Sequence, residues 1–110
     1  MLLLVLALVA APALRAEPQF PPLSGRVVDQ ANLLSPEQEL TLTARLEALE
    51  TQSQRQLVVA TIPDLGGYDI SDYGYQLGRA WGIGDKERRD GALLIVAPNE
   101  RKVRIEVGYG

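Results

Sequence analysis

Residues 56–110 read QLVVATIPDLGGYDISDYGYQLGRAWGIGDKERRDGALLIVAPNERKVRIEVGYG, and this stretch decides the fold. It contains two continuous apolar runs, 57–62 and 92–97, each followed by a proline. Such runs are typical of strands that are covered on both faces of a sheet. A segment of helical length, 70–84, separates them, so we expect the two strands to be parallel and joined by a right-handed crossover.

A further strand is predicted over 102–107, where Val103, Ile105 and Val107 alternate with charged side chains. It follows a turn at 99–100, so it forms an antiparallel hairpin with the strand before it. The alternation predicts that one face of this strand is exposed to solvent, which places the strand near an edge of the sheet.

The helix predicted over 70–84 follows Asp69, which can act as its cap. It contains Gly74 and Gly78, one turn apart on nearly the same face. Each glycine costs a helix about 1 kcal/mol relative to alanine. We therefore expect the two glycines to let the helix backbone sit close to the sheet.

The N-terminal part of the domain supplies one more strand and one more helix. Val27–Val28 is a short strand candidate, and Ser-Pro-Glu-Gln at 35–38 is a strong helix start with a capping box. Leucines at 42, 46 and 49 form the apolar stripe of this helix, which should end near 52–54. The predicted fold class is α/β, a mixed β-sheet with a parallel βαβ crossover and a C-terminal hairpin. Helices pack on this sheet to give an α/β/α sandwich.

The first sixteen residues, MLLLVLALVAAPALRA, form an apolar run that ends in small residues, as a secretory signal peptide does. The run is shorter than the roughly 18 residues of a spanning helix. Residues 17–24 carry three prolines and are predicted to be an extended linker, which leaves 25–110 as the single domain. We therefore expect export to the periplasm or the cell surface.

Composition excludes several classes of function. Removing residues 1–16 takes Arg15 from the 11 basic residues, which leaves 10 against 14 acidic ones and a net charge of −4. This balance argues against a nucleic-acid partner, which would need a clustered basic face. The chain has no cysteine and no histidine, so disulfides, Ser-His-Asp triads and Cys/His zinc sites are excluded. Any metal must be held by oxygen ligands, which favours calcium, magnesium or manganese.

Three blocks of sequence resemble one family. They are GRVVDQANLLSPEQ at 25–38, WGIGDKERRDGALLIVAP at 81–98 and RKVRIEVGYG at 101–110. Together they resemble the TPM domain, which occurs in thylakoid-lumen phosphatase-like proteins, photosystem II repair proteins and YgcG-type exported bacterial proteins. In that family the domain continues past Gly-Tyr-Gly with further helices and an acidic segment, often followed by a membrane anchor. The resemblance therefore implies a C-terminally incomplete copy, with part of one sheet face left bare.

Acidic loop residues are the candidate metal ligands. Asp29, close to Asn32, and Asp90, in an Asp-Gly step, rank first because the resemblance implies divalent-cation binding at acidic loop positions. Their residue types also fit local turn chemistry, in which the side chain bonds nearby backbone N–H groups. Asp64 and Asp85 rank second. The predicted crossover puts Asp64 at the carboxyl end of its strand and both Asp85 and Asp90 at the opposite end, so the four aspartates cannot share one site.

Aromatic side chains offer a second kind of site. Tyr73 and Trp81 share the apolar stripe of their helix and are expected in the core. Tyr68 and Tyr75 lie off that stripe and are candidates for a surface that contacts a partner.

Two functions of different classes remain open. The first is a non-enzymatic module that binds calcium or magnesium and assists assembly, repair or regulation of an envelope or membrane complex. The alternative is a cation-dependent acid phosphatase in which Asp29 and Asp90 hold the ion and an arginine steadies the phosphate. Because the sequence shows no nucleophile–base pair, the non-enzymatic module is favoured.

Overall fold

The computed structural model describes residues 18–83 and 91–108. The predicted signal peptide, Asp85 and Asp90 lie outside these residues. The described elements follow the order strand, helix, strand, helix, strand, strand: β1 (Val27–Asp29), α1 (Pro36–Ser53), β2 (Leu57–Thr61), α2 (Ile70–Trp81), β3 (Ala92–Ala97) and β4 (Lys102–Val107).

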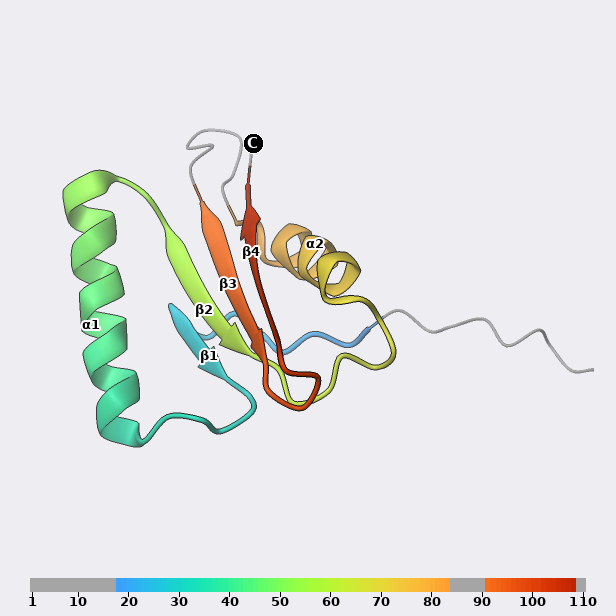
Figure 1. Cartoon of the computed structure of the whole chain (residues 1–110). Helices are drawn as coiled ribbons and strands as arrows, with labels where there is room; N and C mark the ends of the chain where they lie inside the picture. The colour runs from blue at the N-terminus through green and yellow to red at the C-terminus, as the bar shows by residue number, and fades with distance from the viewer. Residues whose placement is uncertain (1–17, 84–90, 109–110) are drawn as a thin grey trace, which may run out of the picture.

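The four strands form one mixed sheet in the order β1-β2-β3-β4 (Figure 1). β1 and β2 are parallel, β2 and β3 are parallel, and β4 returns antiparallel to β3. The predicted fold class, the parallel crossover and the C-terminal hairpin are therefore confirmed. The position predicted for the last strand is also confirmed, because β4 is an edge strand.

The start of α1 follows from its first four residues. The Ser35 hydroxyl accepts a hydrogen bond from the Gln38 backbone N–H at 3.1 Å, and the Gln38 side chain accepts one from the Ser35 N–H at 2.9 Å. Pro36 occupies the first helical position, where a missing N–H costs nothing. The helix ends at Ser53 because Gln54 takes a left-handed conformation with φ 64°. The predicted capping box and the predicted helix end are both confirmed.

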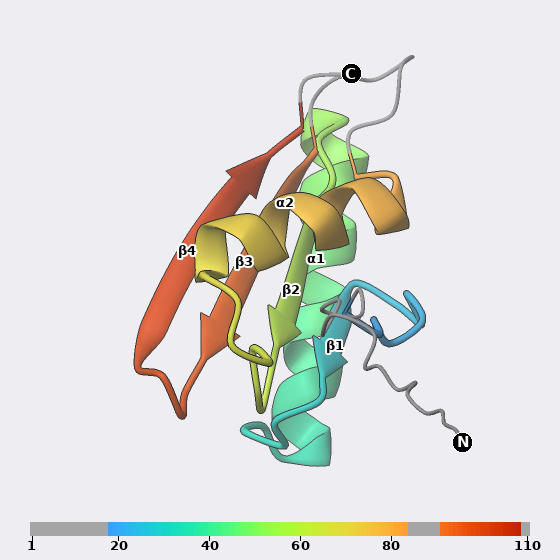
Figure 2. The ribbon, with the colours of Figure 1, turned by 90° about the vertical axis from the view of Figure 1, so that its right-hand side faces the viewer.

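The two crossovers have opposite hands. The strand order advances in one direction, but α1 and α2 lie on opposite faces of the sheet (Figures 1 and 2). In Figure 2 the parallel strands point downward, α2 lies in front of the sheet and β3 lies to the left of β2. The β2–α2–β3 crossover is therefore right-handed, as predicted. The β1–α1–β2 crossover must then be left-handed, which is uncommon.

Each face of the sheet carries its own core. On the α2 face, the largest cluster of buried side chains includes Leu77 of α2 and Leu93 and Ile95 of β3, all at 0% exposure. On the α1 face, a smaller cluster is built on Leu46 of α1, with Val27 and Val59. The difference in size arises because α1 lies over β1 and β2 alone, whereas α2 reaches β3 and β4.

The apolar face of β4 is left open on the α1 side. Val103 is 64% exposed, Ile105 62% and Val107 46%. In the antiparallel register they pair with Val96, Leu94 and Ala92 of β3, whose side chains lie on this same face.

The charged face of β4 is the covered one. The Arg104 and Glu106 side chains face α2 and form an ion pair at 2.9 Å, with side-chain exposures of 39% and 18%. The strand therefore has one face toward solvent, as its alternation predicts, but that face is the apolar one. The alternation determines which side chains of β4 share a face. The position of α2 on the sheet, and not the polarity of these side chains, determines which face meets solvent.

Two glycines of α2 make this covering possible. A Cβ on Gly74 would lie 2.7 Å from Ile95 Cδ1 and 3.5 Å from Arg104 Cδ. A Cβ on Gly78 would meet nothing nearer than Glu106 Cγ, at 3.6 Å. The predicted close approach of helix and sheet is thus confirmed, and it is tightest at Gly74.

The predicted linker contacts the domain. Phe20 packs edge-on against Tyr73, with ring centroids 5.2 Å apart, and the Trp81 indole N–H donates to the Pro21 carbonyl at 2.9 Å. Residues 18–24 therefore lack helix and strand, as their prolines dictate, but they add an aromatic side chain to the α2 face.

Substituting the two α2 glycines separately should give opposite results. Gly78→Ala should raise the free energy of unfolding by about 0.5–1 kcal/mol, because alanine favours the helix and the space is available. Gly74→Ala should lower it by about 1 kcal/mol, because Ile95 has to shift within a packed core. Urea unfolding of both variants beside the unsubstituted chain measures the difference. Equal stabilisation by both substitutions would contradict the close packing at Gly74.

Candidate functional site

The polar side chains of interest lie at the edge of the sheet where the parallel strands end, not along its outermost strands. The carboxyl ends of the parallel strands β1, β2 and β3 meet there, as in other open α/β sheets, where this edge commonly holds the ligand. Asp29 ends β1, Asp64 follows β2, and the turn after β3 contributes Asn99 and Glu100. We call this set of four residues the acidic edge.

The Asp29 carboxylate organises the loop between β1 and α1. Its Oδ1 accepts from the Thr61 hydroxyl at 2.6 Å and from the Leu33 N–H at 3.0 Å, and its Oδ2 accepts from the Leu34 N–H at 2.9 Å. The Thr61 hydroxyl oxygen in turn accepts from the Ala31 N–H at 2.9 Å. Asp29 thus ties β1 to β2 and shapes the turn that leads into α1.

The pKa of Asp29 reflects two opposing effects. Burial alone would raise the pKa of its carboxyl, but the hydrogen bonds from Thr61, Leu33 and Leu34 outweigh it and lower the pKa below the ordinary value of 3.8. The carboxylate is therefore ionised at neutral pH. A carboxylate offers about four lone-pair positions, so three of them are already occupied by these bonds.

The other half of the acidic edge joins β2 to the β3–β4 turn. Glu100 Oε2 accepts from the Leu65 N–H at 3.1 Å, and the Asn99 side-chain N–H donates to the Pro63 carbonyl at 2.7 Å. Asp64 Oδ1 accepts from the Gly66 N–H at 2.8 Å. Glu100 Oε1 is buried and has no hydrogen-bond partner among residues 18–83 and 91–108, which is unusual for a carboxylate oxygen.

Sequence reasoning missed Thr61, Asn99 and Glu100. Thr61 looked like one more member of an apolar run, and residues 99–100 looked like turn residues only. A usable signal was present, because all three positions lie at the carboxyl ends of predicted parallel strands.

The structure separates the predicted metal ligands into two groups. Asp29 and Asp64 lie at the same edge, whereas Asp85 and Asp90 lie outside the described residues. Gly91, which follows Asp90, precedes the start of β3 at the opposite edge. Thr61 pairs with both Asp29 and Val96, so Gly91 is five residues, or about 16 Å, along the strand from the level of Asp29. The described residues give no support to one ion shared by Asp29 and Asp90.

Asn32 shapes the loop in another way. It takes a left-handed conformation with φ 56°, which asparagine adopts more readily than most residues, and its N–H donates to the Asp29 carbonyl at 3.1 Å. Its observed contact is therefore that of a turn residue.

The aromatic candidates differ in exposure. Tyr73 is buried, and burial followed by the Asp64 charge raises the pKa of its hydroxyl, while Trp81 is partly buried against the same cluster. Tyr68 also packs against this cluster and is partly buried. Tyr75 is 51% exposed, and the guanidinium of Arg79 lies over its ring, 5.4 Å from the ring centroid. Of the two predicted surface tyrosines, Tyr75 alone presents its ring broadly to solvent.

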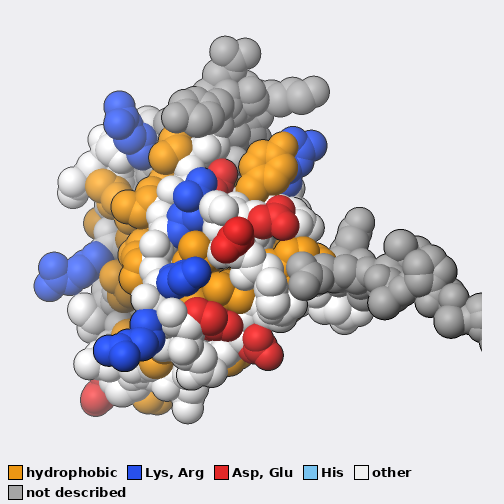
Figure 3. Space-filling view, turned by 45° about the vertical axis from the view of Figure 1, so that its right-hand side comes forward, with side chains coloured by type: hydrophobic (Ala, Val, Ile, Leu, Met, Phe, Trp, Pro, Cys, Tyr) orange, Lys and Arg blue, Asp and Glu red, His pale blue; other side chains and the backbone are white. Residues whose placement is uncertain are grey.

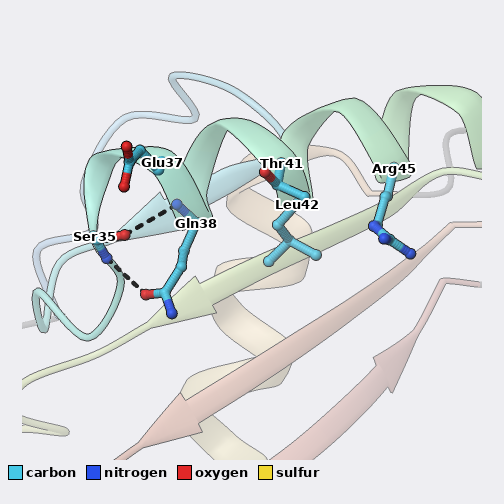
Figure 4. A pocket seen from close by; sticks show the side chains of 6 residues that line it. All are labelled: Ser35, Glu37, Gln38, Thr41, Leu42 and Arg45. Carbon is cyan, nitrogen blue, oxygen red and sulfur yellow. Dashed lines mark hydrogen bonds between the residues drawn. The ribbon is translucent and has the colours of Figure 1, made fainter.

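A shallow hollow runs beside the N-terminal half of α1 (Figure 4). Gln38, Leu42 and Arg45 project from the helix toward the strands, whereas Glu37 points away from them. All but one of the lining residues are polar or charged, with Leu42 the exception, and the amide oxygen of Gln38 is already used by the capping box.

Within residues 18–83 and 91–108, no group of three or more Asp or Glu side chains is close enough to hold a metal ion. In the same residues, no helix has the length and apolarity that crossing a bilayer requires. The described part of the acidic edge therefore does not form a complete cage for a metal ion.

The fold and this edge define a small α/β domain with a mixed four-stranded sheet and a carboxylate-bearing loop edge. Residues 27–110 match the family model described as the TPM domain. Because the match covers most of the chain, the protein belongs to the TPM domain family, and the resemblance noted in its sequence is confirmed.

Two solved structures support this assignment. The N-terminal domain of a protein from P. gingivalis is 36% identical with a TM-score of 0.70, over 77% of this chain and 54% of that one. The N-terminal domain of the cg2496 protein from Corynebacterium glutamicum is 21% identical with a TM-score of 0.66, over 89% of this chain and 62% of that one, and shows the fold alone. The chain thus spans little more than half the length of these two structures. No curated protein matches it.

The hydrogen bonds of Asp29 predict a specific dependence of stability on pH. Because folding lowers its pKa, the stabilisation is complete above the unfolded value of 3.8 and is lost as pH falls through the lower folded value. Asp29→Asn should lower the free energy of unfolding by about 1–2 kcal/mol at pH 7. This gap to the unsubstituted chain should close below pH 3.8. Chemical unfolding at several pH values measures it, and a gap that stays constant into acid would contradict the assignment.

Proposed function

We propose that this TPM-domain protein is an exported accessory module that works by binding other proteins and assists assembly, repair or regulation of an envelope or membrane complex. The observation that carries the proposal is the open apolar surface of the β3–β4 hairpin on the α1 side. Exposed, contiguous apolar side chains of this kind mark interaction surfaces in folded proteins.

This surface has the composition of a binding site. Val103, Ile105 and Val107 form its outer row, and the β3 side chains paired with them form its inner row. Figure 3 shows hydrophobic side chains gathered on one side of the molecule, with Lys and Arg side chains beside them. On the α1 side, Arg45 borders the hollow and is exposed. An apolar surface with basic side chains nearby suits a protein segment with apolar and acidic side chains.

We further propose that a divalent cation, calcium or magnesium, binds at the acidic edge and has a structural role there. Asp64 and Glu100 fit this role better than Asp29, because Glu100 Oε1 is buried without a partner and Asp64 has one oxygen outside its bond to Gly66. Hard cations of this kind take oxygen ligands and accept water in the remaining positions.

The alternative, a cation-dependent acid phosphatase, is favoured by one observation. Arg101, exposed and with φ 59°, follows Glu100 directly in the same turn, so a guanidinium is present at the edge where the cation would bind. Such a group could steady a phosphate beside the ion.

Calcium and magnesium titrations of the full chain, followed by calorimetry and thermal melting, test the cation proposal. We expect calcium to raise the melting temperature, because it binds the folded state only. Glu100→Gln and Asp64→Asn should each abolish the rise, whereas Asp72→Asn, an exposed acidic residue of α2, is the matched control.

A rise that survives Asp64→Asn and Glu100→Gln but not Asp29→Asn or Asp90→Asn would move the site to the latter residues. No rise with either metal would contradict cation binding. Hydrolysis of p-nitrophenyl phosphate that depends on the metal and is lost in Arg101→Ala would favour the phosphatase over the accessory module.

A further inference from the structure

The free edge of β4 differs from the other edge of the sheet. β1 has only three residues, which is too short for extensive pairing with a further strand, whereas β4 has six. Residues 102–107 include no proline and no glycine, and each pairs with β3 in an uninterrupted register without a bulge. Long regular edges of this kind are available for pairing with another strand.

The register shows which backbone groups are available. The Gly108 N–H donates to the Gly91 carbonyl at 2.8 Å, so this pair is of the hydrogen-bonded type. In an antiparallel ladder the hydrogen-bonded pairs alternate, so the even-numbered residues of β4 direct their N–H and carbonyl groups toward β3. Val103, Ile105 and Val107 therefore direct theirs outward, away from the sheet.

We propose that β4 pairs with β4 of a second copy of this chain, antiparallel about a two-fold axis at Ile105. This register places Ile105 opposite Ile105 of the second copy, and Val103 opposite Val107. All of these residues have outward backbone groups, so each such pair can exchange two N–H to carbonyl hydrogen bonds. The two sheets then continue as one eight-stranded sheet.

Charge complementarity selects this register. Arg104 of one copy lies opposite Glu106 of the other, and the two-fold axis repeats the contact. Opposite charges across an antiparallel pair are stabilising, and like charges destabilise it. The Arg104–Glu106 ion pair within each strand thus becomes part of a four-membered network on the α2 face, and Lys102 lies opposite the uncharged Gly108.

The same pairing also brings the apolar side chains of the two β4 strands together. Val103, Ile105 and Val107 lie on the open α1 side, so their side chains meet those of the second copy across the new strand pair. The association therefore covers part of each exposed side chain and joins two open surfaces into one. It goes beyond the proposed accessory role and does not depend on the acidic edge or on a cation.

Backbone pairing can be tested separately from side-chain packing at one position. Ile105→Pro removes an N–H that β3 does not use, and proline is tolerated on edge strands at such positions. Ile105→Thr keeps the N–H and a β-branched side chain while it lowers apolarity. Sedimentation velocity from micromolar to millimolar chain, with thermal melts as a check of folding, measures the self-association of each variant.

We expect the unsubstituted chain to form dimers, Ile105→Thr to weaken them only slightly, and Ile105→Pro to weaken them about tenfold or more. A monomer at every concentration would overturn the proposal and leave the open surface to another protein. Equal weakening by both substitutions would also overturn it, because face-to-face packing would then be the cause.

Charge reversal tests the register. Arg104→Glu and Glu106→Arg should each weaken the dimer, because like charges then face each other, and the double variant should restore it. The double variant also restores the ion pair within each strand, so its recovery supports the two-fold pairing centred on Ile105 only when both single variants keep a normal melting temperature. If the double variant is as weak as the single variants while its melting temperature is normal, the proposed register is wrong.

Discussion

The structure depends on the position of β3 between β2 and β4, with its alternate side chains on opposite faces of one sheet. Its alternate side chains serve different cores: Leu93 and Ile95 contact the α2 side, and Leu94 contacts the α1 side. A slip of one residue in its pairing would exchange these two sets. The parallel register with β2 and the antiparallel register with β4 therefore fix which side chains of every strand are buried.

Two surfaces follow from this constraint. Because β1, β2 and β3 are parallel, their carboxyl ends meet and bring Asp29, Asp64 and Glu100 to one edge. Because α2 approaches β3 and β4 closely at Gly74, the charged side chains of β4 lie under the helix and its valines and isoleucine face solvent. The acidic edge and the open apolar surface are thus built from different residues of the same sheet.

Local signals in the sequence were sufficient for most of the fold. The capping box at Ser35, the two continuous apolar runs and the glycine pair of α2 each act over a few residues, and each prediction from them was confirmed. The family also followed from local motifs and was confirmed over 27–110.

The sequence was less informative about features that depend on contacts between residues far apart in the chain. Which face of β4 is covered depends on where α2 sits, and the amphipathic pattern of a single strand does not contain that information. The bonds of Asp29 to Thr61, and the approach of Glu100 to Leu65, join residues more than 30 positions apart. Metal ligation by Asp29, Asp64, Asp85 or Asp90 stays a prediction.

Amide hydrogen exchange, followed residue by residue by NMR in dilute and concentrated samples, most directly tests the claim that the free side of β4 is an interaction surface. In dilute solution the amides of Val103, Ile105 and Val107 should exchange quickly, and those of Arg104 and Glu106 slowly. At high concentration the account predicts that the three outward amides alone gain protection. Protection that does not change with concentration, or that rises equally along β4, would contradict it.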